Sequence, residues 1–236
     1  MALAHHAYPH HYRHIPARAR SEYIAGLDLG KQHDRSVFSV IHHTRTPIET
    51  DGPEAWIIDD RARVCRQASI TRYDLLVMST LPLKMDYVSQ ALLVRELISR
   101  EPLVSTKAKL IVDISGVGMG VADLMRSQGL RFIGVQITAG TEQTQVDGEN
   151  YRVAKQLLVS KLEAALHANE LRVPELLPEE SEFKKELESF KRKAKTSGAN
   201  TWSADTGEFD DRVMSVAYAI WWATSGSSVS TEPLVI

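Results

Sequence analysis

The sequence predicts a single α/β domain in which helices flank a mixed central sheet. A chain of 236 residues with a hydrophobic fraction of 43% is long enough for one sizeable core. Short β-rich runs come first along the chain, and strand and helix patterns alternate after them. The formal charge of −2 and a single cysteine, Cys65, describe an ordinary protein of a reducing compartment, with no intrachain disulfide.

The two ends of the chain are predicted to lie outside this domain. Residues 1–21 are rich in histidine and lack aliphatic periodicity, which predicts a disordered tail; chance metal binding is the alternative interpretation. Residues 22–225 form the predicted domain, and residues 226–236 a flexible end. No apolar run approaches the roughly 18 residues of a membrane helix, and the N-terminus lacks a signal-peptide core. These features predict a cytoplasmic protein with no membrane partner.

The first half of the domain reads as strands followed by a helix. Residues 22–30 and 36–43 predict two adjacent strands joined by a turn. Residues 54–69 add a third strand or a hairpin arm. Residues 86–100 carry apolar side chains at helical spacing and predict a helix.

The second half alternates strands and helices. Residues 107–115 form a buried type of strand that runs into the glycine turn 116–120. A helix over 121–129 and a strand over 131–138 follow. A unit of this length implies parallel strands with a right-handed crossover.

The last part of the chain is predicted to be mainly helical. A long helix over 151–170 precedes a charged segment over 179–195, and the final helix covers 209–224. Phe190–Gly207 is predicted to form a β-hairpin insertion before this last helix. In the final helix, Tyr218, Trp221 and Trp222 have the spacing of core residues.

Two glycine-rich turns do not fit phosphate-binding loops. Gly26 and Gly30 are separated by three residues instead of four, and Gln32 stands where a Walker loop needs a hydroxyl. The second turn, at residues 116–120, is followed by Val121 where a dinucleotide fingerprint needs glycine. Neither turn therefore predicts a nucleotide site.

Aspartates at strand ends give a stronger signal. Asp28 and Asp113 each lie in or at the end of an apolar strand, where an unpaired carboxylate costs several kcal/mol. Two carboxylates about 4 Å apart repel by roughly 4 kcal/mol at an effective dielectric constant near 20. A divalent cation removes this penalty, and carboxylate oxygens suit magnesium or manganese. The alternative is that each aspartate caps a turn or a helix.

A second acidic pair opens the final helix. Acidic residues such as Asp210 and Asp211 are favoured there by the helix dipole and by capping. Their position nevertheless allows three carboxylates to meet at one end of a sheet, as two-metal phosphodiester chemistry requires.

Six segments in collinear order resemble the nuclease domain of the phage terminase large subunit, which has a ribonuclease H-like fold of the retroviral integrase superfamily. The segments are GLDLGKQHDRSV, LPLKMDYVSQALLVREL, IVDISGVGMGVADLM, VQITAGTE, YRVAKQLLVSKLEAALHANELRVP and FDDRVMSVAYA. Together they span roughly residues 22–224. Ala154 stands where the family commonly has proline, and Phe209 where it often has histidine.

The resemblance implies a metal-dependent endonuclease that cuts concatemeric viral DNA during genome packaging. Asp28 would bridge two Mg2+ or Mn2+ ions, Asp113 would bind one ion, and Asp211 or Asp210 the other. Asp34 would be an outer ligand. For double-stranded DNA, the candidate phosphate contacts are Lys155 and the basic residues Lys191, Arg192, Lys193 and Lys195. A solvated charged face is the other interpretation of this basic segment.

The resemblance also implies partners and leaves alternatives open. A packaging ATPase motor, a portal and a small terminase subunit are the expected partners. Because this chain lacks a Walker loop, either it is a nuclease domain that is encoded or produced separately, or the motor is a different polypeptide. A sugar-kinase or actin-like ATPase is disfavoured by the chain length. A Holliday-junction-type resolvase of the same fold and a non-catalytic DNA-packaging module remain as alternatives.

Overall fold

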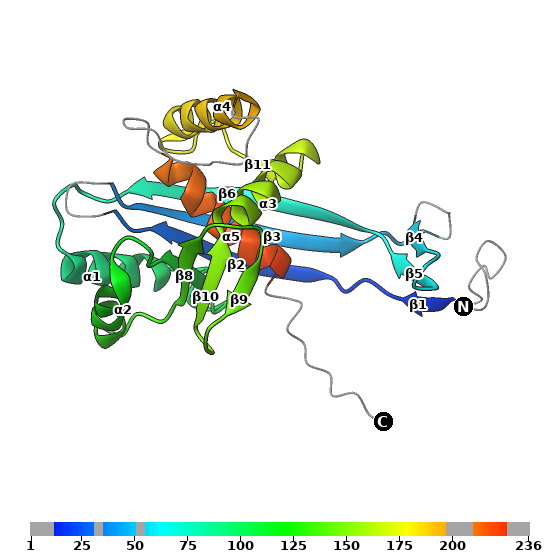
Figure 1. Ribbon diagram of the computed structural model, residues 1–236, viewed down its shortest axis with the longest axis horizontal. Coiled ribbons are helices and arrows are strands. Elements are labelled where there is room, and N and C mark those ends of the chain that lie inside the picture. Colours follow the sequence, from blue (N-terminus) through cyan, green and yellow to red (C-terminus); the bar gives the residue numbers. More distant parts are fainter. Residues whose placement is uncertain (1–11, 31–34, 51–54, 197–209, 226–236) are drawn as a thin grey trace.

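A long mixed sheet forms the centre of the protein (Figure 1). The computed structural model describes residues 12–30, 35–50, 55–196 and 210–225. Its main sheet has eight strands in the order β11-β6-β3-β2-β7-β8-β10-β9, and a smaller sheet has the order β1-β5-β4. This arrangement, with helices on both faces of the main sheet, confirms the predicted fold class.

The elements of the two sheets and the helices have the following bounds. The main sheet contains β2 (Arg20–Asp28), β3 (Val37–Pro47), β6 (Ser69–Thr80), β7 (Lys109–Asp113), β8 (Ile133–Thr138), β9 (Gln143–Gln145), β10 (Asn150–Ala154) and β11 (Leu171–Arg172). The small sheet contains β1 (Arg13–Ile15), β4 (Trp56–Asp59) and β5 (Val64–Gln67). The helices are α1 (Tyr87–Ile98), α2 (Gly118–Ser127), α3 (Lys155–His167), α4 (Glu180–Thr196) and α5 (Asp211–Ser225).

The strand directions bring the carboxyl ends of several strands to one end of the main sheet. β2 runs antiparallel to β3 and parallel to β7, and β7 runs parallel to β8. The predicted parallel strand-helix-strand unit is therefore β7, α2 and β8. As a result, the carboxyl ends of β2, β7 and β8 all lie at the end of the sheet where α2 begins.

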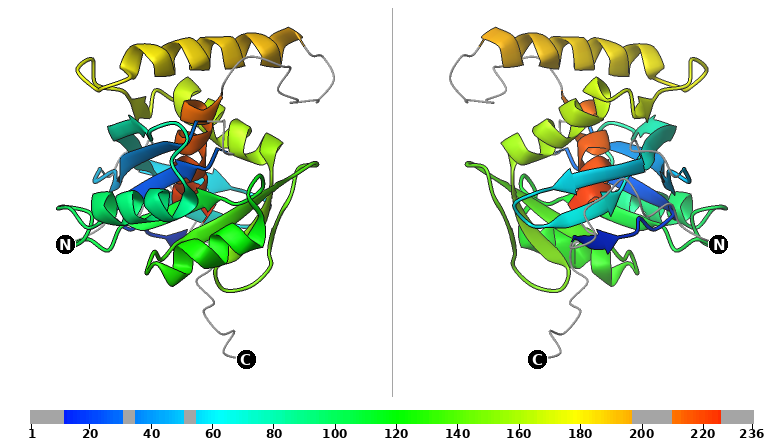
Figure 2. Two further views of the ribbon diagram at one scale, coloured as in Figure 1. Left: turned by 90° about the vertical axis from the view of Figure 1, so that its left-hand side faces the viewer. Right: turned by 90° about the vertical axis from the view of Figure 1, so that its right-hand side faces the viewer.

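The two faces of the sheet are covered by different helices (Figure 2). Ile24 of β2 and Ile111 of β7 belong to the core that contains α3 and α5. The neighbouring Ala25 and Val112 belong to the core that contains α1 and α2. Successive strand residues point to opposite faces, so the face of each side chain in β2 and β7 is known.

One predicted element differs from the structure, and the structure decides between the two interpretations of another. The predicted long helix over 151–170 begins only at Lys155, because Asn150–Ala154 pair with β8 as strand β10. For residues 54–69, the hairpin arm is confirmed and the third strand is not: β4 and β5 pair antiparallel in the small sheet. The place of a third strand in the main sheet is taken by β6, which the local sequence pattern did not reveal.

The predicted hairpin and tails are only partly within the described residues. Residues 190–196 belong to helix α4, so the hairpin predicted from Phe190 is wrong there, and residues 197–207 lie outside the described part. Strand β1 and the start of β2 lie within the predicted N-terminal tail, so ordered chain begins before residue 22. Residues 1–11 and 226–236 are outside the described part. None of the described helices is long and apolar enough to cross a membrane.

Candidate active site

Asp28 and Asp113 end two neighbouring parallel strands. Leu27 of β2 lies opposite Val112 of β7, so the next residue in each strand is an aspartate. Asp28 shares a strand face with Ile24, and Asp113 shares one with Ile111. Both carboxyl groups therefore lie on the sheet face that packs against α5, at the carboxyl ends of their strands.

Helix α5 lies directly on β2 because Gly26 has no side chain. A Cβ atom at Gly26 would stand 1.8 Å from the carbonyl oxygen of Ser215, which no side chain could tolerate without displacing the helix. The glycine thus lets helix backbone and strand backbone touch. This close approach holds the start of α5, with Asp210 and Asp211, at the same end of the sheet as Asp28.

Asp28 is the centre of a cluster of negative charge. It is partly buried, and burial raises its pKa well above the ordinary value. The charges of Asp113, Asp211 and Asp210, in that order, raise the pKa of Asp28 further. The four aspartates predicted from the sequence are therefore close enough to interact, and we call them the acid cluster.

Lys155 is the cation that faces the acid cluster. Its ammonium nitrogen Nζ lies 2.8 Å from Oδ2 of Asp210, and its charge lowers the pKa of Asp28. Lys155 is the first residue of α3, where the helix dipole disfavours a positive charge. The ion pair with Asp210 compensates for this position. One lysine does not balance four carboxylates.

Asp113 is held by two hydrogen bonds. The hydroxyl of Tyr218 donates to Oδ2 at 2.8 Å, and the backbone N–H of Ser115 donates to Oδ1 at 2.7 Å. Burial, followed by the charges of Asp28 and Asp113, raises the pKa of Tyr218 well above its ordinary value. Tyr218 is a core residue, as predicted, but it also orients a carboxylate of the cluster. Its place two helical turns after Asp211 was the sequence signal for this second role.

Arg212 anchors the start of α5, and the sequence patterns did not identify it. The residue is only 5% exposed. Its guanidinium donates to Glu179 at 2.8 Å and to Glu186 of α4 at 2.5 Å, and it also reaches the hydroxyl of Thr80 at 3.1 Å. The backbone N–H of Arg212 donates to Glu186 at 3.0 Å. An arginine inside an apolar helix was the visible signal for such a network.

The Arg212 network links three elements next to the acid cluster. Glu179 also accepts from the backbone N–H of Thr80, at the end of β6, at 2.7 Å. Burial raises the pKa of Glu186, and the nearby guanidinium opposes that shift. Since Arg212 follows Asp210 and Asp211 directly, the network fixes the position of both carboxylates.

The donor set of the cluster fits a hard divalent cation in kind. Its groups are all carboxylates, and burial followed by the charges of the other three aspartates raises the pKa of Asp28 although Lys155 opposes the shift. Within the described residues, no three Asp, Glu, His or Cys side chains stand at metal-holding positions. Asp34, the predicted outer ligand, lies outside the described part of the chain. Asp28, Asp113, Asp210 and Asp211 are the carboxylates whose charges interact, and they are the candidate ligands although their side chains do not form a metal-holding arrangement here.

The other residues predicted to contact DNA lie at the end of α4. Lys191, Arg192, Lys193 and Lys195 belong to that helix, and their side chains are outside the described part. Earlier in the same helix, Lys184 forms an ion pair with Glu180 one turn before it.

Two solved structures of one nuclease have a similar fold. The chain is similar to the large terminase nuclease of the thermophilic phage G20c, with a TM-score of 0.53 and 18% identity over 90% of this chain and 93% of that one. It is equally similar to the same nuclease with bound magnesium, over 89% of this chain and 92% of that one. No protein-family model matches the sequence, and no curated protein matches it. The similarity establishes the fold, which is the one that the sequence resemblance implied.

Proposed function

We propose that this protein is a metal-dependent DNA endonuclease related to the terminase large-subunit nuclease. One observation carries the proposal: Asp28, Asp113, Asp210 and Asp211 converge at the carboxyl ends of β2 and β7. The similarity to a terminase nuclease, one structure of which holds magnesium, supports the choice of substrate and cation. The substrate is double-stranded DNA, cut as concatemers during viral genome packaging in the host cytoplasm.

Each residue of the site has a proposed task in this reaction. Asp28 and Asp113, with Asp211 or Asp210, would hold two Mg2+ or Mn2+ ions, which would activate water and stabilise the leaving 3′-oxygen. Tyr218 and Ser115 keep the Asp113 carboxylate in a fixed orientation through their hydrogen bonds. Lys155 supplies positive charge next to Asp210, and its proposed task is to contact a DNA phosphate. Asp34 is proposed as an outer ligand.

The proposed partners follow from the resemblance to the terminase large-subunit nuclease. We expect a packaging ATPase motor, a portal and a small terminase subunit to bring DNA to this chain. The DNA phosphate backbone is proposed to be contacted by four basic residues of α4: Lys191, Arg192, Lys193 and Lys195.

The test is cleavage of supercoiled plasmid by the purified chain with Mg2+, with Mn2+ and with a chelator. Asp28→Asn and Asp113→Asn should abolish metal-dependent cutting. Asp123→Asn, which changes an exposed aspartate of α2, is the matched control and should cut normally. Calorimetric titration of Mn2+ gives a readout that does not depend on turnover.

Three outcomes separate the alternatives. Cutting that persists in both cluster variants would overturn the assignment. A chain that binds DNA and Mn2+ without cutting would be a packaging module. Preference for a four-way junction over linear duplex would indicate a resolvase.

A further inference from the structure

One end of the long sheet projects away from the helices (Figure 1). The projection consists of the small sheet, the linker from β1 to β2 and the ends of β3 and β6. We call the described residues within 12–20 and 45–72 the arginine arm. It lies at the opposite end of β2 from Asp28.

The arginine arm is positively charged although the chain as a whole is negative. Residues 12–20 and 45–72 contain eight arginines, no lysine and five acidic residues, which gives a formal charge of +3. Because the whole chain carries −2, the other residues together carry −5. The arginine arm is thus a region of net positive charge, as is the basic segment at the end of α4.

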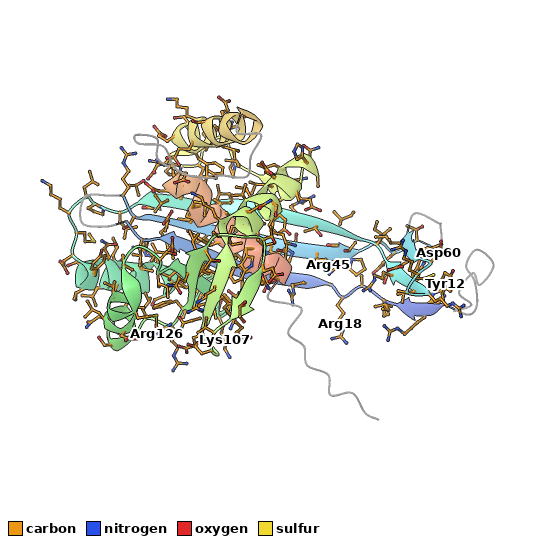
Figure 3. All side chains as sticks on the ribbon, viewed as in Figure 1. Tyr12, Arg18, Arg45, Asp60, Lys107 and Arg126 are labelled. Atoms are coloured by element: carbon orange, nitrogen blue, oxygen red, sulfur yellow. The ribbon has the colours of Figure 1, made fainter. Side chains whose placement is uncertain are left out.

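Most of these arginines are exposed and have no acidic partner. Six of them are exposed, and none of the six forms an ion pair within the part of the chain that the structure describes: Arg13, Arg18, Arg45, Arg61, Arg63 and Arg66. The arm's aspartates are used locally. Asp60 accepts a hydrogen bond from the hydroxyl of Tyr12 at the tip of the arm (Figure 3), and Asp59 accepts from the backbone N–H of Ala62.

Some arginines lie so close to one another that their like charges repel, which lowers the stability of the fold. Arg20 of β2 lies directly opposite Arg45 of β3, and like charges in that position repel. Glu22 binds Arg20 at 3.2 Å, but the Arg45 guanidinium is instead fixed by a hydrogen bond from Nε to Ser69 at 2.8 Å. In the small sheet, the strand register places Arg13 and Arg66 on one face. A bound anion would relieve this repulsion.

The chemistry of the arm fits the phosphates of DNA. A guanidinium binds phosphate through two parallel hydrogen bonds, which a lysine cannot do. Arg20 and Asp28 are eight residues apart on β2, or about 26 Å at 3.3 Å per residue. This is less than the roughly 34 Å of one duplex turn. One duplex passing the acid cluster can therefore reach the arm.

We propose that the arginine arm binds the phosphate backbone of double-stranded DNA away from the acid cluster. The proposal rests on the proposed function only in taking DNA as the partner. Contacts of this kind fix the duplex on the protein without reading its sequence. The arm would therefore hold the DNA, and the acid cluster would act on it.

The test measures DNA binding by the full chain in the absence of divalent metal. Fluorescence anisotropy of a labelled duplex reports the affinity over a range of salt concentrations. The arm variant changes four exposed arginines to glutamine: Arg13, Arg18, Arg45 and Arg66. We expect its affinity to fall about ten-fold to a hundred-fold, and the slope of log affinity against log salt to fall by about three to four. The loss should be the same for duplexes of unrelated sequence.

Two further variants make the result specific. The same four positions changed to lysine should keep the salt slope and most of the affinity, because the charge remains. A charge-matched control changes four exposed basic residues outside the arm to glutamine: Arg100, Lys107, Lys109 and Arg131. It should lose less than about three-fold in affinity. Circular dichroism and thermal unfolding confirm that each variant is folded.

The outcomes distinguish this proposal from the proposed function. Equal affinity losses in the arm variant and the charge-matched control would overturn the arm proposal, because general charge would then explain binding. Unchanged DNA affinity in the arm variant would also overturn it and leave the arm, with exposed Ile57 and Ile70, as a surface for an acidic protein. Plasmid cleavage by the wild-type chain can succeed or fail independently of either result.

Discussion

The charged groups at the two ends of strand β2 differ in sign, in burial and in whether they have partners. At one end, Asp28 is partly buried among other carboxylates, and Asp113 and Asp210 are held by hydrogen bonds or an ion pair. At the other end, the arginine arm exposes guanidinium groups that have no acidic partner within the described residues. The acid cluster therefore depends on packing among buried groups and is the proposed site of a cation, whereas the arm is the proposed site of an anionic surface. The difference predicts that substitutions at the cluster strongly reduce metal-dependent cleavage, whereas substitutions at the arm mainly weaken DNA binding.

The largest expected effect is on cleavage. Asp28→Ala should lower the rate of plasmid nicking by about a thousand-fold or more, because the central carboxylate of the cluster is lost. Arg18→Gln at the arm should leave the rate at saturating DNA within about three-fold. Single-turnover nicking assays with Mg2+ measure both. Similar losses of nicking rate in the two variants would contradict the proposal that the acid cluster cuts the DNA and the arm only binds it.

Stability should separate the buried arginine from the exposed one. Arg212→Met leaves Glu179 and Glu186 without their cation, so we expect a loss of about 3–5 kcal/mol in the free energy of unfolding. Arg18→Met removes an exposed side chain and should cost less than about 0.5 kcal/mol. Urea unfolding of both variants measures the difference. A small loss for Arg212→Met would mean that α4 and α5 are held by other contacts.

Removing charge from the acid cluster should stabilise the metal-free protein. Because the folded protein raises the pKa of Asp28, wild-type stability falls as pH rises from the ordinary aspartate value near 3.9 through the raised value. Asp28→Asn should therefore gain on the order of 1–3 kcal/mol over wild type at pH 8 and much less at pH 4. Urea unfolding with a chelator at both pH values tests this. Added Mg2+ should then stabilise the wild type but not the variant; a variant less stable than wild type at pH 8 would contradict the explanation.

The smallest expected effect concerns the orientation of Asp113. Tyr218→Phe removes only the hydroxyl that donates to this carboxylate, so metal affinity should fall about ten-fold. Tyr151→Phe, in the same core, is the matched control and should bind metal as the wild type does. Titration calorimetry with Mn2+ measures both. Equal affinities in the two variants would show that Ser115 alone orients Asp113.

Much of the fold and part of the site could be predicted from local sequence patterns. An aspartate that ends an apolar run is visible without a structure, because strand periodicity and burial cost act within a few residues. Asp28 and Asp113 were found in this way, and parallel pairing of β2 and β7 places them side by side. Local patterns gave the wrong result for residues 151–154, since their pairing with β8 overrides a helix-like spacing.

The sequence alone determined which residue types carry the charge, that Asp28 and Asp113 lie in or at the end of apolar strands, and that the final helix opens with two aspartates. Only the tertiary structure decided which groups meet. Contact between α5 and Gly26 brings Asp211 to Asp28, and the fold sets the bond from Tyr218 to Asp113. It also pairs Lys155 with Asp210 and collects the arginines at the far end of the sheet. These contacts join residues distant in the chain, so their energies depend on packing that no local pattern contains.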